Sequence, residues 1–184
     1  MSEERELTVA QAKTLLRCRN VWRWSIVNIA RRQSVAEHSY LVTIIGTALY
    51  DQCMTRHSLL ERATFVSYLL QHDAEEALLG DIPATVKQAI ELRSPHLLSM
   101  VKRDLGAEVA HSHSFDGTPL KVLAKVADYV EAFKFAAENG APDHVVEFLS
   151  DHLRDTMADG EEQHGAVVDW VKLRVIVNEF IDHA

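Results

Sequence analysis

The sequence contains little of what secreted and membrane proteins require. Its 184 residues include two cysteines, Cys18 and Cys53, which have neither CxxC spacing nor the secretory context of a disulfide framework. No stretch approaches the roughly 18 apolar residues of a membrane span, and the polar start MSEERELT is unlike a signal peptide. We therefore expect a cytoplasmic protein without a membrane partner, in which both cysteines are reduced.

Basic residues are also scarce over most of the chain. The formal net charge is -8, which argues against broad binding to duplex DNA, because such binding needs a basic surface. Residues 7–36 are the exception, with six basic side chains and no acidic one, whereas eleven acidic and three basic residues follow from Glu138 to the end. This asymmetry favours a small anionic ligand near the first third of the chain over a nucleic-acid polymer, although a solvated basic helix face would explain the same charges.

The apolar residues follow helical spacing almost throughout. Apolar residues make up 47% of the chain, and no repeat, linker or low-complexity stretch interrupts it, so one all-α domain is expected over residues 1–184. A capping-box pattern at Thr8 and Gln11 predicts the first helix. The expected helices run from Thr8 to about Asn20, from about Val35, from Ser58 to Gly80, from Pro83, from Ser94 to about His113, from Pro119 to Gly140, and after Pro142 and Gly160.

Several polar side chains extend the apolar stripes of these helices. His38 begins a stripe that continues through Leu41, Ile45 and Leu49, and Phe65 and Leu69 lead to His72 and then to Glu76. Asp73 continues the neighbouring stripe, and Asp128 lies in the middle of the long helix. Such residues should point inward, where a polar group without a partner is costly.

A divalent metal ion would satisfy these side chains. Imidazole and carboxylate groups are suitable ligands for Zn, Mn, Fe or Co, so His38, His72, Asp73 and Asp128 form a candidate set of four ligands. Glu76 would lie beside the ion and exchange a proton with a bound water. Taken singly, each of these residues is more often a hydrogen-bonded core or surface group than a metal ligand.

Three motifs in a fixed order carry a resemblance to a known family. SVAEHSY (34–40), HDAEEALLGDIP (72–83) and KVADYVEAF (125–133) resemble the signatures of HD-domain metal-dependent phosphohydrolases, and especially of bacterial 5'-deoxynucleotidases and deoxynucleoside triphosphohydrolases. Arg23-Trp24 stands fifteen residues before His38, as an Arg-Trp pair does in those enzymes. The resemblance covers residues 17–135, whereas the helices of 142–184 add little, and it implies a single HD-domain helical bundle.

The resemblance also implies a role for each residue. It assigns one divalent metal (Zn, Co or Mn) to His38, His72, Asp73 and Asp128, with additional Mg on the phosphates as an option. It assigns proton transfer to Glu76 and the placement of water and substrate to Asp81. The implied substrate contacts are the scissile phosphate for Arg23, the sugar or base for Trp24, the adenine edge for Ile26 and further phosphates for Lys87.

The resemblance implies a deoxynucleotide substrate, with two versions of the reaction. Ile26 follows Trp24 by two residues, as in small phage-type dATP triphosphohydrolases, so dATP is the leading choice. Because 5'-deoxynucleotidases can also carry an aliphatic residue there, hydrolysis of deoxynucleoside monophosphates is the alternative. A phosphodiesterase or alarmone hydrolase would share the metal set but not the Arg23-Trp24 pair, and a non-catalytic nucleotide-binding HD module would be expected to lose a ligand or Glu76.

Three further features have open interpretations. Arg31 and Arg32 lie in the loop before the first motif, and contact with a substrate phosphate and exposure to solvent are equally good interpretations of them. His111 and His113 form an HxH pair that is a second metal site or, as we favour, a polar helix terminus. Apolar residues on both faces of the last helix favour a homo-oligomer, either a dimer or a higher assembly.

Overall fold

The computed structural model describes residues 8–94, 96–97, 100–101 and 115–182, and this part of the chain consists of helices joined by turns and loops, with two isolated β-bridges and no strand. None of its helices is long and apolar enough to span a membrane. The predicted all-α fold is confirmed, whereas the helix expected from Ser94 to His113 lies largely outside the described residues. The elements are α1 (Val9–Leu15), η1 (Leu16–Asn20), α2 (Val35–Cys53), α3 (Leu59–Gln71), α4 (Glu76–Leu79), α5 (Ala84–Arg93), α7 (Pro119–Glu138), α8 (Asp143–His164) and α9 (Trp170–Ile181).

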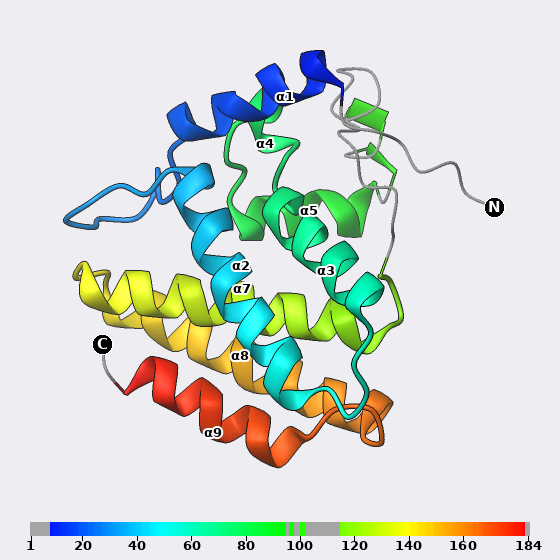
Figure 1. The fold of residues 1–184 in the computed structure, drawn as a ribbon. Helices are drawn as coiled ribbons and strands as arrows, with labels where there is room; N and C mark the ends of the chain where they lie inside the picture. Colours follow the sequence, from blue (N-terminus) through cyan, green and yellow to red (C-terminus); the bar gives the residue numbers. More distant parts are fainter. Residues whose placement is uncertain (1–7, 95, 98–99, 102–114, 183–184) are drawn as a thin grey trace.

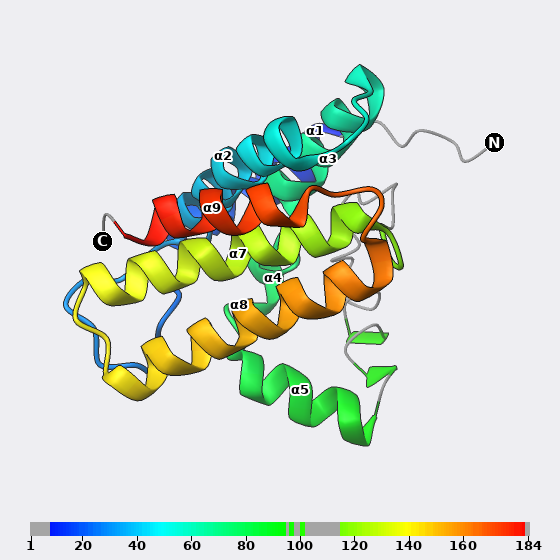
Figure 2. The same cartoon turned by 90° about the horizontal axis from the view of Figure 1, so that it is seen from below.

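Helices α2 and α7 cross at the centre of the molecule (Figure 1). Helix α3 packs on α2, α8 packs on α7, and α9 contacts both α2 and α7, so that α7, α8 and α9 lie side by side (Figure 2). The core between them contains Tyr50, Phe65, Leu123 and Leu173, each at most 1% exposed. This packing fixes α2 against α7, with His38 in the first turn of α2 and Asp128 in the middle of α7.

Helix α8 does not end where the sequence suggested. We expected Gly160 to separate two helices, but α8 continues through it to His164. A Cβ atom at position 160 would lie 2.5 Å from both Trp170 Cη2 and Val122 Cγ1. The glycine therefore serves the close packing of α7, α8 and α9 rather than helix termination.

The helix expected from Ser58 to Gly80 is interrupted. Helix α3 ends at Gln71, a turn covers residues 72–75, and α4 begins at Glu76. In the turn the Ala74 amide donates to the Gln71 carbonyl and the Glu76 amide to the Asp73 carbonyl, both at 3.0 Å, which is the tighter three-residue pattern. Gly80, with φ of 76°, follows α4 as the predicted terminal glycine.

Residues 21–35 form a loop that folds back on the start of α2. Trp22 and Ser34 form an antiparallel bridge, and the Arg23 amide donates to the Gln33 carbonyl at 2.8 Å. The Val35 amide donates to the Val21 carbonyl at 3.0 Å. This pairing places Arg23 and Trp24 close to the first turn of α2, which carries His38.

Candidate active site

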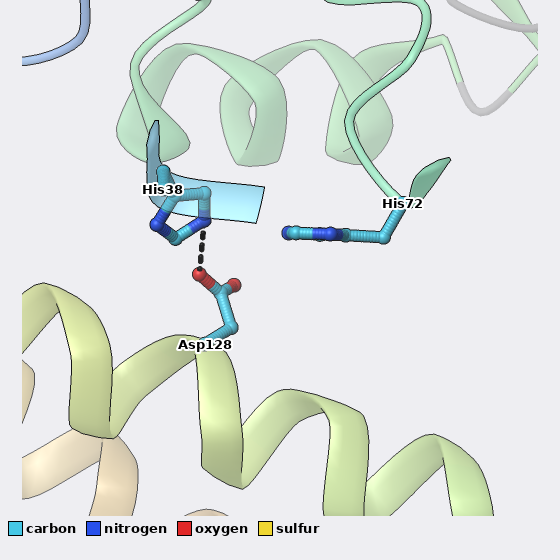
Figure 3. A group of neighbouring side chains, drawn as sticks. All are labelled: His38, His72 and Asp128. Atoms are coloured by element: carbon cyan, nitrogen blue, oxygen red, sulfur yellow. Dashed lines mark ion pairs between the residues drawn. The ribbon is translucent and has the colours of Figure 1, made fainter. Parts of the chain in front are cut away.

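Three helical segments bring the predicted metal ligands together. His38 from α2, His72 at the end of α3 and Asp128 from α7 offer ligand atoms that lie within 4.8 Å of one another (Figure 3). The His38 Nε2 atom is 3.1 Å from Asp128 Oδ1. Asp73 Oδ2 lies 3.4 Å from His72 Nε2 and 3.7 Å from His38 Nε2. The structure therefore places all four residues of the predicted set around one point.

The two imidazoles are oriented as metal ligands would be. His72 Nδ1 donates to the Leu69 carbonyl at 2.7 Å, and His38 Nδ1 lies 2.5 Å from the buried carboxylate of Glu131. Both Nε2 atoms face the cluster and, among the described residues, have no hydrogen-bond partner although they are buried. A buried nitrogen without a partner is costly, and a divalent cation would satisfy it. The donor set of two imidazoles and two carboxylates thus fits a transition metal such as zinc.

The carboxylates at this centre are held in the charged form. Burial opposes the charge of Asp73, but the nearby His72 and His38 outweigh it and lower its pKa. Burial also opposes the charge of Asp128, but its close contact with His38 prevails and lowers its pKa. For His38, burial and Arg23 oppose protonation, yet Asp128 and Glu131 raise its pKa. The charged carboxylates at this centre favour a cation.

Glu131 and Gln33 are site residues that the sequence interpretation missed. Glu131, 3% exposed, accepts from Gln33 Nε2 at 2.5 Å and contacts His38 Nδ1. Gln33 is fully buried. The signal for Glu131 was its place three residues after Asp128, on the same face of the helix. Gln33 carried no such signal, because it lies in a loop without periodicity.

Arg23, which was expected to bind phosphate, lies beside the group of candidate metal ligands. Its guanidinium is 4.0 Å from Asp128 Oδ1 and 3.6 Å from Glu131 Oε2, and its side chain is 16% exposed. Trp24 stacks on Phe135 with ring centroids 5.9 Å apart and an interplanar angle of 14°. Its backbone has φ of 66°, a rare conformation for a bulky residue and one that functional sites often hold under strain.

Glu76 and Lys87 form a pair next to the cluster. Lys87 Nζ donates to Glu76 Oε1 at 2.7 Å, while Glu76 is 2% exposed. Burial and the charge of Asp73 raise the pKa of Glu76 to about 7, although Lys87 opposes this shift. Burial also raises the pKa of Asp81, with Arg23 and Lys87 opposing it. An acid whose pKa lies near neutrality is suited to proton transfer, and Glu76 is held beside the group of candidate ligands.

The remaining predicted contacts differ in how they are placed. Ile26 lies in the turn closed by the Val27 amide and is 73% exposed. Arg31 forms a bidentate pair with Glu37, at 2.7 and 3.1 Å, and its guanidinium lies 4.8 Å from the Phe135 ring centroid, so structural partners already occupy it. His111 and His113 lie outside the described residues.

Comparison with known proteins identifies relatives by sequence. A dATP triphosphohydrolase of Salmonella phage PMBT28 is 34% identical over 134 residues, which cover 70% of this chain and 66% of that enzyme, just under two thirds. The 5'-deoxynucleotidase YfbR of Escherichia coli (strain K12 / DH10B) is 30% identical over 134 residues, covering 65% of this chain and 67% of that enzyme.

A solved structure and a family model complete the comparison. The Cyanophage S-2L HD phosphohydrolase (DatZ), solved with dA and one catalytic Zn2+ ion, superposes with a TM-score of 0.72 at 20% identity, covering 94% of this chain and 96% of that one. The family model described as 5'-deoxynucleotidase YfbR-like matches residues 11–158. The predicted resemblance, fold and enzyme class, an HD-domain phosphohydrolase, are thereby confirmed. The chain belongs to the 5'-deoxynucleotidase YfbR-like family.

Proposed function

We propose that this protein is a divalent-metal-dependent hydrolase that cleaves the 5'-phosphoester bond of deoxynucleotides, and that dATP is its leading substrate. The observation that carries the proposal is the pair of buried Nε2 atoms on His38 and His72. Both lack a hydrogen-bond partner among the described residues, and both face carboxylates, with Arg23 alongside. The phage dATP triphosphohydrolase and the bacterial 5'-deoxynucleotidase, by their names, support the same chemistry.

In this proposal His38, His72, Asp73 and Asp128 hold one metal ion. Zinc, cobalt and manganese all suit two imidazoles and two carboxylates, and the zinc in the cyanophage structure supports the first. Bound there, a divalent ion supplies a water of lowered pKa and polarises a phosphate oxygen. Additional Mg would accompany a triphosphate substrate as a counterion of the phosphates.

The protein side chains position the substrate and manage the proton. Arg23 offers donors in a fork that fits phosphate oxygens and offsets negative charge that develops during cleavage. Trp24 offers a ring face to the sugar or base. Glu76, with its pKa near neutrality, gives a proton to the departing 5'-oxygen, and Asp81 helps place the attacking water. The products are a deoxynucleoside and phosphate or a phosphate chain.

Lys87 and Ile26 are the residues on which the choice of substrate depends. Lys87 reaches the β- and γ-phosphates once it leaves Glu76, which favours a triphosphate. Ile26 contacts the adenine edge when the exposed turn that carries it closes over the base. Hydrolysis of deoxynucleoside monophosphates, as the name of the bacterial relative states for that enzyme, is the alternative.

The proposal extends to the assembly and the location of the protein. The outward face of α9 exposes Val171 (72%) and Val175 (53%), one helical turn apart, which supports a homo-oligomer. The small anionic substrate and the reduced cysteines fit the cytoplasm.

A panel of dNMPs, dNDPs and dNTPs tests the proposal, with products separated to distinguish phosphate, pyrophosphate and triphosphate. Triphosphate released from dATP, with little turnover of other dNTPs, supports the leading choice. Phosphate released from several dNMPs alone supports the alternative. A metal-free protein that remains inert after addition of Co, Mn or Zn would contradict the enzyme hypothesis itself.

A further inference from the structure

Gln33 connects the two halves of the site. Its side-chain Nε2 donates to Glu131 Oε1 at 2.5 Å. Its side-chain Oε1 accepts from Trp24 Nε1 at 3.3 Å and from Arg23 Nη1 at 3.5 Å. Gln33 is fully buried, and its three partners belong to different parts of the site. Glu131 contacts His38, which is a proposed metal ligand. Arg23 and Trp24 are the proposed substrate contacts.

The chemistry of these partners fixes the direction of the amide. The indole and guanidinium groups can only donate, and an ionised carboxylate can only accept. A side chain placed between them must therefore accept on one side and donate on the other. Glutamine does both from one planar group, so its orientation is determined by its neighbours.

The other oxygen of Glu131 continues the chain of contacts to the metal centre. Glu131 Oε2 lies 2.5 Å from His38 Nδ1, and His38 presents Nε2 to Asp73 and Asp128. A carboxylate on the far nitrogen of a ligating histidine fixes the ring and its tautomer. The contacts Trp24–Gln33, Gln33–Glu131 and Glu131–His38 thus form one path from the loop before α2 to the proposed metal ligand His38.

We propose that Gln33 is a positioning residue that couples the placement of Trp24 and Arg23 to the orientation of His38 through Glu131. It helps to hold Trp24 in its positive-φ conformation and keeps the Glu131 carboxylate against the imidazole. The inference rests on the proposed function only in assigning the metal to His38. It identifies a residue that touches neither metal nor substrate and still prepares the site for both.

The first experiment needs no substitution. In the wild-type protein the Gln33 side-chain amide protons and the Trp24 indole proton should exchange with deuterium at least tenfold more slowly than the side-chain amide of Gln52, which is exposed on α2. Exchange of the Gln33 amide as fast as that of Gln52 overturns the proposal, and this result does not depend on any variant folding.

The second experiment uses Gln33→Met, which keeps the length and removes both polar atoms, with Gln52→Met as the matched control. Gln33→Met should shift the Trp24 indole N–H resonance and weaken cobalt(II) binding by the chelator-treated protein by about tenfold or more. Gln52→Met should change neither quantity. A folded Gln33→Met protein with unchanged cobalt affinity and an unchanged Trp24 resonance overturns the proposal.

Glu131→Gln tests the path itself. Through Gln33 it should shift the Trp24 resonance in the wild-type background, and it should have no such effect when Gln33 is already methionine. Equal shifts in both backgrounds overturn the coupling. If the wild-type protein binds no cobalt, the metal assignment of the proposed function fails, while proton exchange and the Trp24 resonance still decide whether Gln33 holds the loop.

Discussion

Glu76 offers a test in which activity and stability should change in opposite directions. Glu76→Gln keeps the shape of the side chain and an oxygen for Lys87, but it removes the acidic proton. Loss of a general acid typically lowers turnover by about 10²–10⁴-fold. Because Glu76 lies outside the group of ligand atoms formed by His38, His72 and Asp128, the variant should retain its metal.

The stability of the metal-free protein should rise in the same variant. Burial and Asp73 raise the pKa of Glu76 from its ordinary 4.5 to about 7. The folded state therefore binds more protons than the unfolded state between these values, and the wild-type protein loses stability as the pH rises through them. At about 1.4 kcal/mol for each pH unit, the cost is about 1 kcal/mol at pH 5.5 and about 3 kcal/mol at pH 8. A glutamine resembles the neutral acid and escapes this cost.

Urea unfolding of chelator-treated protein at pH 5.5 and pH 8 measures the difference, and turnover of dATP with added cobalt measures the activity. Glu76→Gln should exceed the wild-type free energy of unfolding by about 2 kcal/mol more at pH 8 than at pH 5.5. Glu147→Gln, at an exposed position of α8, is the control and should match the wild type in both assays. Turnover within twofold of the wild type, or a stability difference that does not grow with pH, would refute the reasoning.

Three further predictions concern the metal, a thiol and the core. Asp128→Ala should lose the ion during gel filtration, measured as metal per chain, and full metal retention would remove Asp128 from the ligand set. Cys53 is fully buried, and burial raises its pKa to about 11, so it should react with a thiol reagent at pH 8 only after unfolding; rapid reaction of two thiols in the native protein contradicts this. Gly160→Ala should lower the melting temperature by a few degrees. The new Cβ atom would lie 2.5 Å from Trp170 and Val122, which costs about 1–3 kcal/mol, whereas the gain in helix propensity is about 1 kcal/mol. An unchanged melting temperature would contradict that packing.

The features predicted well from sequence are those that depend on local periodicity. His38 lies on an apolar stripe of a long helix and is fully buried, whereas Asp128 lies beside the buried face of α7 with its side chain 37% exposed, and both reach the same centre. The capping box at Thr8 is also local, and the structure contains it. The ligand set and the Arg23-Trp24 loop were interpreted through family motifs, and the structure brings those residues together.

The features that were missed depend on contacts between distant parts of the chain. Gln33 and Glu131 are 98 residues apart in sequence, and nothing near Gln33 indicates a carboxylate partner. Glycine is common at helix ends, and Gly160 was therefore expected to end a helix. Its actual role depends on Trp170 and Val122, which belong to other helices. A local pattern cannot distinguish a glycine that ends a helix from one that admits a neighbouring ring.

The break after α3 explains how two adjacent residues can serve one metal. On a continuous helix, residues i and i+1 do not face each other, so His72 and Asp73 would point in different directions. Because α3 ends at Gln71 and a tight turn follows, Asp73 Oδ2 comes to 3.4 Å from His72 Nε2. The same turn delivers Glu76 to the start of α4, where Lys87 reaches it. The departure from the predicted helix is therefore the local structure that brings the His72-Asp73 dipeptide and Glu76 to the same centre, where we propose that they act as two ligands and an acid.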